Sequence, residues 1–461
     1  MTTIRVVFLA IFVASMCGVT LGQDAQQAPP PVPLVEGNDR VTSPGGTEVK
    51  PDSRPLTGAQ PLTLGSVLER SYLLPSVSLM QIMTTNAGGG PGQSDIEGEA
   101  TLTGNVALNK LWSRSQFSMH YTGGGLLGEG SSGTSSFYQS FGVSQAFIFR
   151  RSSLSFFDVG SYAPESPFGF FGLTSFQPPV LNGSLVPNQS ILTGQASQWS
   201  NSLTGQVNYT VSRRLSMTGV AGFGILRSSD SEFLSSTQGN FSLGLNYVVG
   251  PKDTLGVTYA NSIIGFGNSA NANVANGNTL ITHSVQAAYG RRITGRLAFQ
   301  ASGGPQIYSS SDTSSSSHFS WAAQSGLTYG LREGSVGITY GHYVTGGSGV
   351  FAGANTDTLT ASFSRHLSRK VAGSVSAAYA RNSSLALSGV VTGHSVFDTE
   401  YVAASLTRPL RRELEMYLNY NLQHQSSTGL SCGFLLCGES VTRHVVGLGL
   451  DWHARPLPLG R

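Results

Sequence analysis

The sequence predicts an all-β protein, a transmembrane antiparallel up-and-down β-barrel of about 18 strands (16–18), with a disordered Pro-rich N-terminal tail. Three observations predict it. Apolar and small polar residues alternate with a period of two in one run after another. The polar positions carry Ser, Thr, Asn, Gln and Gly, so that only 11% of the 461 residues are charged, against about 25% in a typical soluble domain. Basic residues gather in the short turns between the runs.

The composition also excludes several classes of protein. No apolar run of about 18 or more residues follows the N-terminus, which rules out a protein that crosses a membrane with helices. The formal charge of +3 is too small and too scattered for a nucleic-acid binder, so no nucleic-acid partner is expected. Three cysteines are too few for a disulfide-rich scaffold.

Residues 1–22 have the pattern of a signal peptide. Arg5 precedes the apolar run 6–17, and small residues follow up to Gly22, where we expect cleavage. Residues 23–72 predict a Pro-rich periplasmic linker that is largely disordered, because it cannot bury enough apolar area to offset the entropy of ordering. Contact with a cell-wall partner is one interpretation of this linker, and its composition favours a plain tether.

The barrel itself is predicted over residues 73–453, and residues 414–423 show its pattern best. Leu414, Met416, Leu418, Tyr420 and Leu422 alternate there with Glu415, Tyr417, Asn419, Asn421 and Gln423. Eighteen runs of this kind are expected at 73–84, 97–109, 114–122, 137–149, 153–161, 198–211, 214–226, 236–249, 253–264, 279–290, 296–308, 317–329, 335–345, 355–366, 370–381, 395–407, 413–424 and 440–453. An even strand number puts both chain ends on one side, so residues 454–461 form a short periplasmic tail.

The chemistry of the two strand faces decides which face meets lipid. A soluble sandwich carries many charges on its outer face, but the polar faces here are nearly uncharged, which favours apolar faces in lipid and polar faces around a lumen. Seventeen of the 27 Lys and Arg residues lie in eight short turns: Lys110, Arg114, Arg150, Arg151, Arg213, Arg214, Lys252, Arg291, Arg292, Arg296, Arg332, Arg365, Arg369, Lys370, Arg408, Arg411 and Arg412. An aromatic residue often precedes the turn, as at Phe149, Tyr209, Tyr247, Tyr289, Tyr329 and Phe363. Rings beside basic groups are typical of the boundary with outer-membrane lipid head groups.

Acidic residues gather at the opposite end, in or beside the long loops. They are Asp95, Glu97, Glu99, Glu129, Glu165, Asp230, Glu232, Asp312, Asp357, Asp398, Glu400 and Glu439. A mouth lined with carboxylates should favour cations slightly, and less so at high salt.

These features resemble a Gram-negative outer-membrane β-barrel protein of the general porin type, over about residues 73–453. The resemblance implies a location in the cell outer membrane, with short turns and both termini in the periplasm and long loops outside. It implies recognition by the barrel assembly machinery through Gly447, Leu450 and Trp452, which match the family's C-terminal signal, although this chain continues past the aromatic to Arg461. The family's frequent homotrimers imply the same assembly here.

The longest connection, residues 162–197, is a candidate pore constriction or lid. Its Phe168, Phe170 and Phe171 argue against disorder in so long a loop. The stretch 164–169 resembles the Pro-Glu-Phe-Gly constriction motif of general porins, so the resemblance implies Glu165 as a constriction carboxylate. A lid packed over the mouth is the alternative.

No enzyme site, metal site or cofactor is predicted. The histidines are scattered, and no metal-binding or phosphate-binding motif occurs. His424 and His444 flank the last long loop near Glu439, and we interpret them as rim residues rather than a hydrolase site. Cys432 and Cys437 lie in that loop, where export predicts a disulfide.

The function predicted is an outer-membrane channel for passive diffusion of small hydrophilic solutes, weakly favouring cations. The candidate lumen-lining residues are Gln206, Asn208, Asn246, Gln286, Gln300, Gln324, Glu415, Asn419, Asn421 and Gln423. The alternative is a plugged or closed outer-membrane barrel that acts as a surface receptor, adhesin or structural anchor. A soluble β-propeller is disfavoured because it needs four shorter strands per repeat.

Overall fold

The computed structural model describes residues 71–85, 96–128, 136–163, 197–229, 234–267, 278–311, 317–347, 350–385, 395–428 and 440–459. The predicted signal peptide 1–22 and nearly all of the linker 23–72 lie outside these residues. So do the constriction candidates Glu165, Phe168, Phe170 and Phe171, and the predicted disulfide partners Cys432 and Cys437. Among the described residues, no helix is long and apolar enough to cross a membrane.

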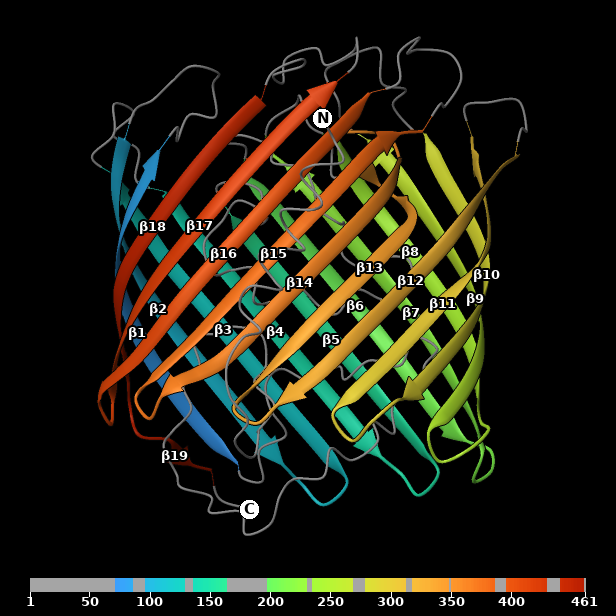
Figure 1. The fold of residues 1–461 in the computed structure, drawn as a ribbon, viewed down its shortest axis with the longest axis horizontal. Helices are drawn as coiled ribbons and strands as arrows, with labels where there is room; N and C mark the ends of the chain where they lie inside the picture. Colours follow the sequence, from blue (N-terminus) through green and yellow to red (C-terminus); the bar gives the residue numbers. More distant parts are fainter. Residues whose placement is uncertain are drawn as a thin grey trace.

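In the described part of the chain, eighteen long strands and one two-residue strand form a single antiparallel sheet. They are β1 (Tyr72–Thr85), β2 (Ile96–Leu111), β3 (Ser115–Gly128), β4 (Ser136–Ile148), β5 (Ser152–Ala163), β6 (Gln198–Thr210), β7 (Leu215–Ser228), β8 (Ser235–Val248), β9 (Asp253–Gly267), β10 (Thr279–Arg292), β11 (Leu297–Ser310), β12 (Ser317–Leu331), β13 (Gly334–Thr345), β14 (Ala354–Ser368), β15 (Val371–Ser384), β16 (Val396–Arg411), β17 (Leu414–Thr428), β18 (Ser440–His453) and β19 (Leu457–Pro458). Each long strand pairs with its neighbours in sequence, and β1 pairs with β18 to close the barrel (Figure 1). The predicted fold class, an all-β up-and-down barrel of 18 strands, is confirmed.

Every one of the eighteen predicted runs coincides with an observed strand, including the first, which contains a proline. Pro75 has no backbone N–H to donate to a neighbouring strand. The β1–β18 ladder begins one residue later, at Ser76 opposite His453, and the carbonyl of Pro75 accepts a hydrogen bond from the Ala454 amide at 3.0 Å. Pro75 therefore stands where the neighbouring strand has ended, and no ladder bond is lost.

Register and burial together show which strand face points into the barrel. On β6, Thr204 and Gln206 are 1% and 2% exposed, whereas Leu203 and Val207 are 47% and 45% exposed. Inward side chains of a closed barrel crowd together while outward ones diverge, so the polar face points inward and the apolar face outward. This is the orientation that the uncharged polar faces predict.

The outward apolar face carries tyrosines at the short-turn end and farther along the strands. At the end with the short turns, Tyr209, Tyr247 and Tyr329 lie half-exposed on the outer surface. Towards the other end, called here the loop end, four outward tyrosines bond to a titratable neighbour: Tyr259 to His283 (2.9 Å), Tyr340 to Asp357 (2.9 Å), Tyr379 to Asp398 (2.6 Å) and Tyr420 to His444 (3.0 Å). The eighteen long strands have 12–16 residues each, enough for the roughly 9–11 residues with which a tilted strand crosses a bilayer.

Three acidic residues that were expected at the mouth lie instead on the outer surface. Asp357, Asp398 and Glu400 share the outward face with Leu359 and Val402 through the β14–β15 and β15–β16 registers. Side chains alternate along a strand, so a carboxylate a few residues from a loop can point away from the lumen. The acidic lining of the mouth is therefore smaller than the sequence suggested.

The tail after β18 folds back across the short-turn end. Leu457 and Pro458 pair with Leu73 and Tyr72 of β1. The Arg455 Nε donates to Glu413 Oε1, between β16 and β17, at 2.7 Å. Both described ends of the chain thus lie at the short-turn end of the barrel (Figure 1).

Candidate functional site

The inward wall of the barrel is the first candidate site. All ten predicted lumen-lining residues occupy register positions on the inward face: Gln206, Asn208, Asn246, Gln286, Gln300, Gln324, Glu415, Asn419, Asn421 and Gln423. Most of them are buried or half-buried, whereas Gln300, near the short-turn end, is exposed. Their role as a solute-contacting lining stays a prediction.

Hydrogen bonds between neighbouring strands tie the inward wall together. The Asn208 Oδ1 accepts from Thr218 Oγ1 at 3.1 Å, and its Nδ2 donates to Ser153 Oγ at 3.3 Å, which links β5, β6 and β7. On the far side of the barrel, Tyr401 donates to Asn421 Oδ1 at 3.0 Å. The wall thus consists of neutral groups that bond one another and keep further donor and acceptor capacity for water or a solute.

Carboxylates on the inward face lie towards the two ends of the strands. Glu97 and Glu99 point inward near the loop end of β2, opposite Thr84 and Ile82 of β1. Glu415 points inward at the short-turn end. The middle of the described wall is therefore neutral, and the inward carboxylates stand near the entrance and the exit.

A hairpin tip, residues 343–354, folds into the mouth of the barrel. It joins β13 to β14, and all of it except 348–349 is described. Val344 packs there with Leu234, Ile264, Phe266 and Leu280, each 1–6% exposed; these five residues are called the rim cluster. Because Ile264, Phe266 and Leu280 lie on the inward faces of β9 and β10, the tip reaches across the inside of β11 and β12.

Two glycines give the hairpin tip its shape. Gly347 has φ 71° and Gly353 has φ 119°, in the region that residues with a Cβ rarely adopt. The amides of Val350 and Phe351 both donate to the Gly347 carbonyl, at 3.0 and 3.1 Å. The Phe351 ring meets Phe397, on the inward face of β16, with ring centres 5.5 Å apart. The tip therefore places aromatic and aliphatic groups inside a wall that is otherwise polar.

Sequence reasoning missed this inward segment. It assigned the narrowing role to residues 162–197, whose candidates lie outside the described residues. A local signal did exist: the alternation fails at the loop ends of β9 and β10, where Ile263 is followed by Ile264 and Leu280 by Ile281. Two adjacent apolar residues on one strand require an apolar partner on each face.

The residues predicted to form the assembly signal lie on the strand that closes the barrel. Leu450 and Trp452 point outward, 42% and 47% exposed, and pair with Leu79 and Val77 of β1. Gly447 points inward, where a Cβ would approach Met80 Sδ to 2.9 Å. This glycine therefore gives room for the Met80 side chain.

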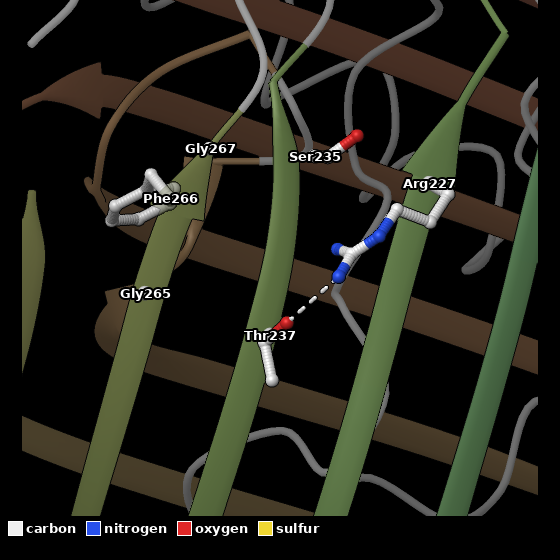
Figure 2. A pocket seen from close by; sticks show the side chains of 6 residues that line it. All are labelled: Arg227, Ser235, Thr237, Gly265, Phe266 and Gly267. Atoms are coloured by element: carbon white, nitrogen blue, oxygen red, sulfur yellow. Dashed lines mark hydrogen bonds between the residues drawn. The ribbon is translucent and has the colours of Figure 1, made fainter. Parts of the chain in front are cut away.

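A small recess of about 230 Å³ lies at the loop end of β7, β8 and β9. Figure 2 shows Arg227 reaching from β7 towards Thr237 on β8, with Gly265 and Gly267 on β9 beside them. The guanidinium donates to the Leu226 and Ser236 carbonyls at 3.1 Å and to Thr237 Oγ1 at 3.3 Å. These bonds hold the arginine against the outer surface of the rim.

The two histidines near the last loop make separate contacts. His424 Nδ1 lies 2.7 Å from Thr442 Oγ1, and His444 Nδ1 lies 3.0 Å from the Tyr420 hydroxyl. Both face outward, while Glu439 lies outside the described residues. Within the described ranges, no group of three His, Cys, Asp or Glu side chains is arranged to hold a metal ion.

No known protein family and no curated protein matches this chain. Solved structures with similar folds include OpdQ of Pseudomonas aeruginosa, at 11% identity and a TM-score of 0.42, covering 85% of this chain and 100% of that one. The outer membrane protein opdK of Pseudomonas aeruginosa has 10% identity and a TM-score of 0.40, covering 83% and 98%. The siderophore receptor PirA of Acinetobacter baumannii has 8% identity and a TM-score of 0.42, covering 85% and 81%.

Proposed function

We propose that this chain is an outer-membrane channel for the passive diffusion of small hydrophilic solutes. The observation that carries the proposal is the contrast between the two faces of one closed barrel. Its outward face is an apolar band that carries tyrosines, and its inward face is a neutral, hydrogen-bonding wall. Barrels of about 16–18 strands enclose an interior wide enough for an aqueous path. In the outer membrane, the short-turn end would face the periplasm.

Single-channel recording in planar bilayers tests the proposal directly. Purified protein should produce discrete current steps, because hydrated ions pass wherever small polar solutes do. A lipid bilayer exposed to heat-denatured protein serves as the control. Absence of steps from correctly folded protein, shown by a mobility difference between boiled and unboiled samples, would reject an open channel.

The proposed channel should favour cations weakly. Glu97 and Glu99 place two carboxylates on the inward face near the mouth, against one inward arginine there, Arg443. A net negative entrance raises the local concentration of cations. A KCl gradient should give a reversal potential on the cation-selective side, reduced in a Glu97→Gln/Glu99→Gln variant. The preference should shrink at high salt, where charges are screened. An anion preference in the unaltered protein would contradict this part of the proposal.

A closed barrel acting as a receptor, adhesin or structural anchor is the second candidate function. The hairpin tip crosses the inside of the mouth, and inward residues such as Thr204, Gln206 and Thr218 are only 1–2% exposed. Such low exposure favours a narrowed lumen. Current steps that appear only after Phe351→Ala and Phe397→Ala remove the aromatic contact of the tip would support the closed barrel over the open channel.

Further proposals concern residues outside the described ranges. We propose that Cys432 and Cys437 form a disulfide, which the intact mass before and after alkylation tests. Glu165 and its neighbouring phenylalanines are proposed to narrow the lumen or cover its mouth, and deletion of residues 165–190 should then raise the conductance. Mass spectrometry of the exported protein should find the mature N-terminus after Gly22.

Assembly and partners are proposed on the same basis. Truncation after Trp452 removes the unusual tail and tests whether the Gly447, Leu450 and Trp452 signal suffices for insertion by the assembly machinery. Mobility of unboiled protein on a detergent gel distinguishes a homotrimer from a monomer.

A further inference from the structure

One seam in the barrel wall is incomplete. The β12–β13 ladder runs from Leu331–Gly334 up to Ala323–His342 and stops there, although β12 continues to Ser317 and β13 to Thr345. The upper part of β12 stays paired with β11, and the upper part of β13 stays paired with β14. The two strands therefore separate towards the loop end (Figure 1), and residues 317–322 and 343–345 are called the seam.

Two backbone groups at the foot of the seam have side-chain partners in place of the neighbouring strand. Continuing the register by two steps would pair Trp321 with Val344. Instead, Ser320 Oγ donates to the Trp321 carbonyl at 3.4 Å, and the Val344 amide donates to Gln306 Oε1 at 3.3 Å. An open strand edge normally leaves such groups to water or to another chain. Since side chains satisfy both groups here, the separation of the strands is built into the sequence.

An aromatic stack covers the foot of the seam on the outer surface. The Trp321 ring lies on the His342 ring at 4.1 Å, with the planes 14° apart. Trp321 is 49% exposed, while His342 is 8% exposed. His342 Nδ1 lies 2.7 Å from Asp357 Oδ1, which also accepts from the Tyr340 hydroxyl at 2.9 Å. His342 Nε2 is buried and has no hydrogen-bond partner within the structure described.

Apolar surfaces lie on both sides of this stack. On the outer surface, Phe319 is 74% exposed and continues the lipid-facing band beyond Trp321. On the inner side, Val344 of the seam belongs to the rim cluster with Ile264 and Leu280. The seam therefore joins a lipid-facing apolar surface to an apolar cluster inside a polar barrel, with an unfilled hydrogen-bonding nitrogen at its foot.

We propose that the seam is a lateral opening in the barrel wall that admits one acyl chain of an amphiphile from the outer leaflet. Trp321 covers the opening, the acyl chain lies against Val344 and Leu280, and His342 Nε2 bonds the polar head group. The shared chemistry is one acyl chain with a hydrogen-bonding head, which a membrane lipid or a free fatty acid can supply. This site does not depend on whether the lumen conducts ions.

Photolabelling of the full-length protein in lipid nanodiscs tests the proposal. One arm uses dodecanoic acid with a diazirine on the chain, and the other uses a phospholipid with the same group on one acyl chain. Mass spectrometry should find labels at 317–322, at 343–345 and at the inward residue Leu280, several-fold above the fully paired outward residue Phe223. Labelling in the first arm alone identifies a free amphiphile, and labelling in the second identifies a membrane lipid.

Two tryptophan variants separate the seam from entry through the mouth. Trp321→Ala should raise the labelling of Leu280 several-fold, because it uncovers the seam. Trp199→Ala is the matched control, since Trp199 is 45% exposed and faces outward on β6, which is paired on both sides at this position. It should leave the labelling of Leu280 unchanged. Boiled and unboiled mobility and ion conductance check that both variants fold.

Uniform labelling around the outward band, without label on Leu280, would overturn the proposal. So would equal labelling of Leu280 in both variants, because that result identifies the mouth as the route. If Trp321→Ala does not fold, the labelling pattern of the unaltered protein decides alone. Loss of ion conductance with seam labelling intact would reject the channel and leave the lateral site standing.

Discussion

Two neighbouring alanines on β16 allow the orientation of the barrel faces to be tested by placing the same residue, arginine, at each position in turn. Ala403 lies inward, opposite Ser376 and Asn421, whereas Ala404 lies outward, opposite Val375 and Tyr420. Both residues stand at the middle of β16 (Val396–Arg411). We expect Ala404→Arg to be strongly destabilising and Ala403→Arg to be tolerated.

The magnitude follows from where the guanidinium must go. An arginine on the lipid face near the midplane of a barrel costs about 2–4 kcal/mol. Since about 1.4 kcal/mol corresponds to a tenfold change, the ratio of folded to unfolded protein should fall roughly 30- to 700-fold for Ala404→Arg. At position 403 the same side chain enters a polar wall, where Asn421 and neighbouring groups can accept its hydrogen bonds.

Urea titration in liposomes, followed by tryptophan fluorescence, gives the free energies of unfolding. Conductance adds a second readout: Ala403→Arg should move the reversal potential towards anions, and the folded fraction of Ala404→Arg should keep the original selectivity. Equal destabilisation of the two variants, or the reverse order, would refute the assignment of the faces and the channel proposal with it.

Three further predictions concern packing and single hydrogen bonds. Leu280→Ala removes a 1%-exposed member of the rim cluster and should lower the free energy of unfolding by about 2–4 kcal/mol. Hydrogen exchange of the hairpin tip should then accelerate. Val285→Ala, on the outward face of the same strand, is the control and should leave the exchange rate of the tip unchanged. Tyr379→Phe removes the 2.6 Å bond to Asp398 and should lower the free energy of unfolding by about 1–2 kcal/mol, measured by urea titration. Arg455→Ala should leave the urea midpoint unchanged, because exposed ion pairs contribute little; a clear drop would mean that the folded-back tail stabilises the barrel.

The candidate site could be anticipated only in part. The ten lumen candidates were placed correctly on the inward face because side chains alternate between the two faces of a strand, and the sequence shows this alternation directly. The expected acidic mouth was wrong at Asp357, Asp398 and Glu400, because distance from a loop says nothing about the direction of a side chain. The rim cluster was missed because Leu280 and Val344 lie far apart in the sequence, and only the inward bend of β13 brings them together.

The sequence alone predicted the positions of the strands, the lipid-facing side of each and their number to within two, because period-two alternation and turn chemistry act between neighbouring residues. The tertiary structure alone decided where a ladder stops. Trp321 and Val344 are residue types that also occur in fully paired strands, so nothing in the sequence marks them. Their separation depends on Gln306, Ser320 and the positive-φ glycines of the hairpin tip. These contacts join segments that meet only after the barrel has closed, so no local pattern could reveal them.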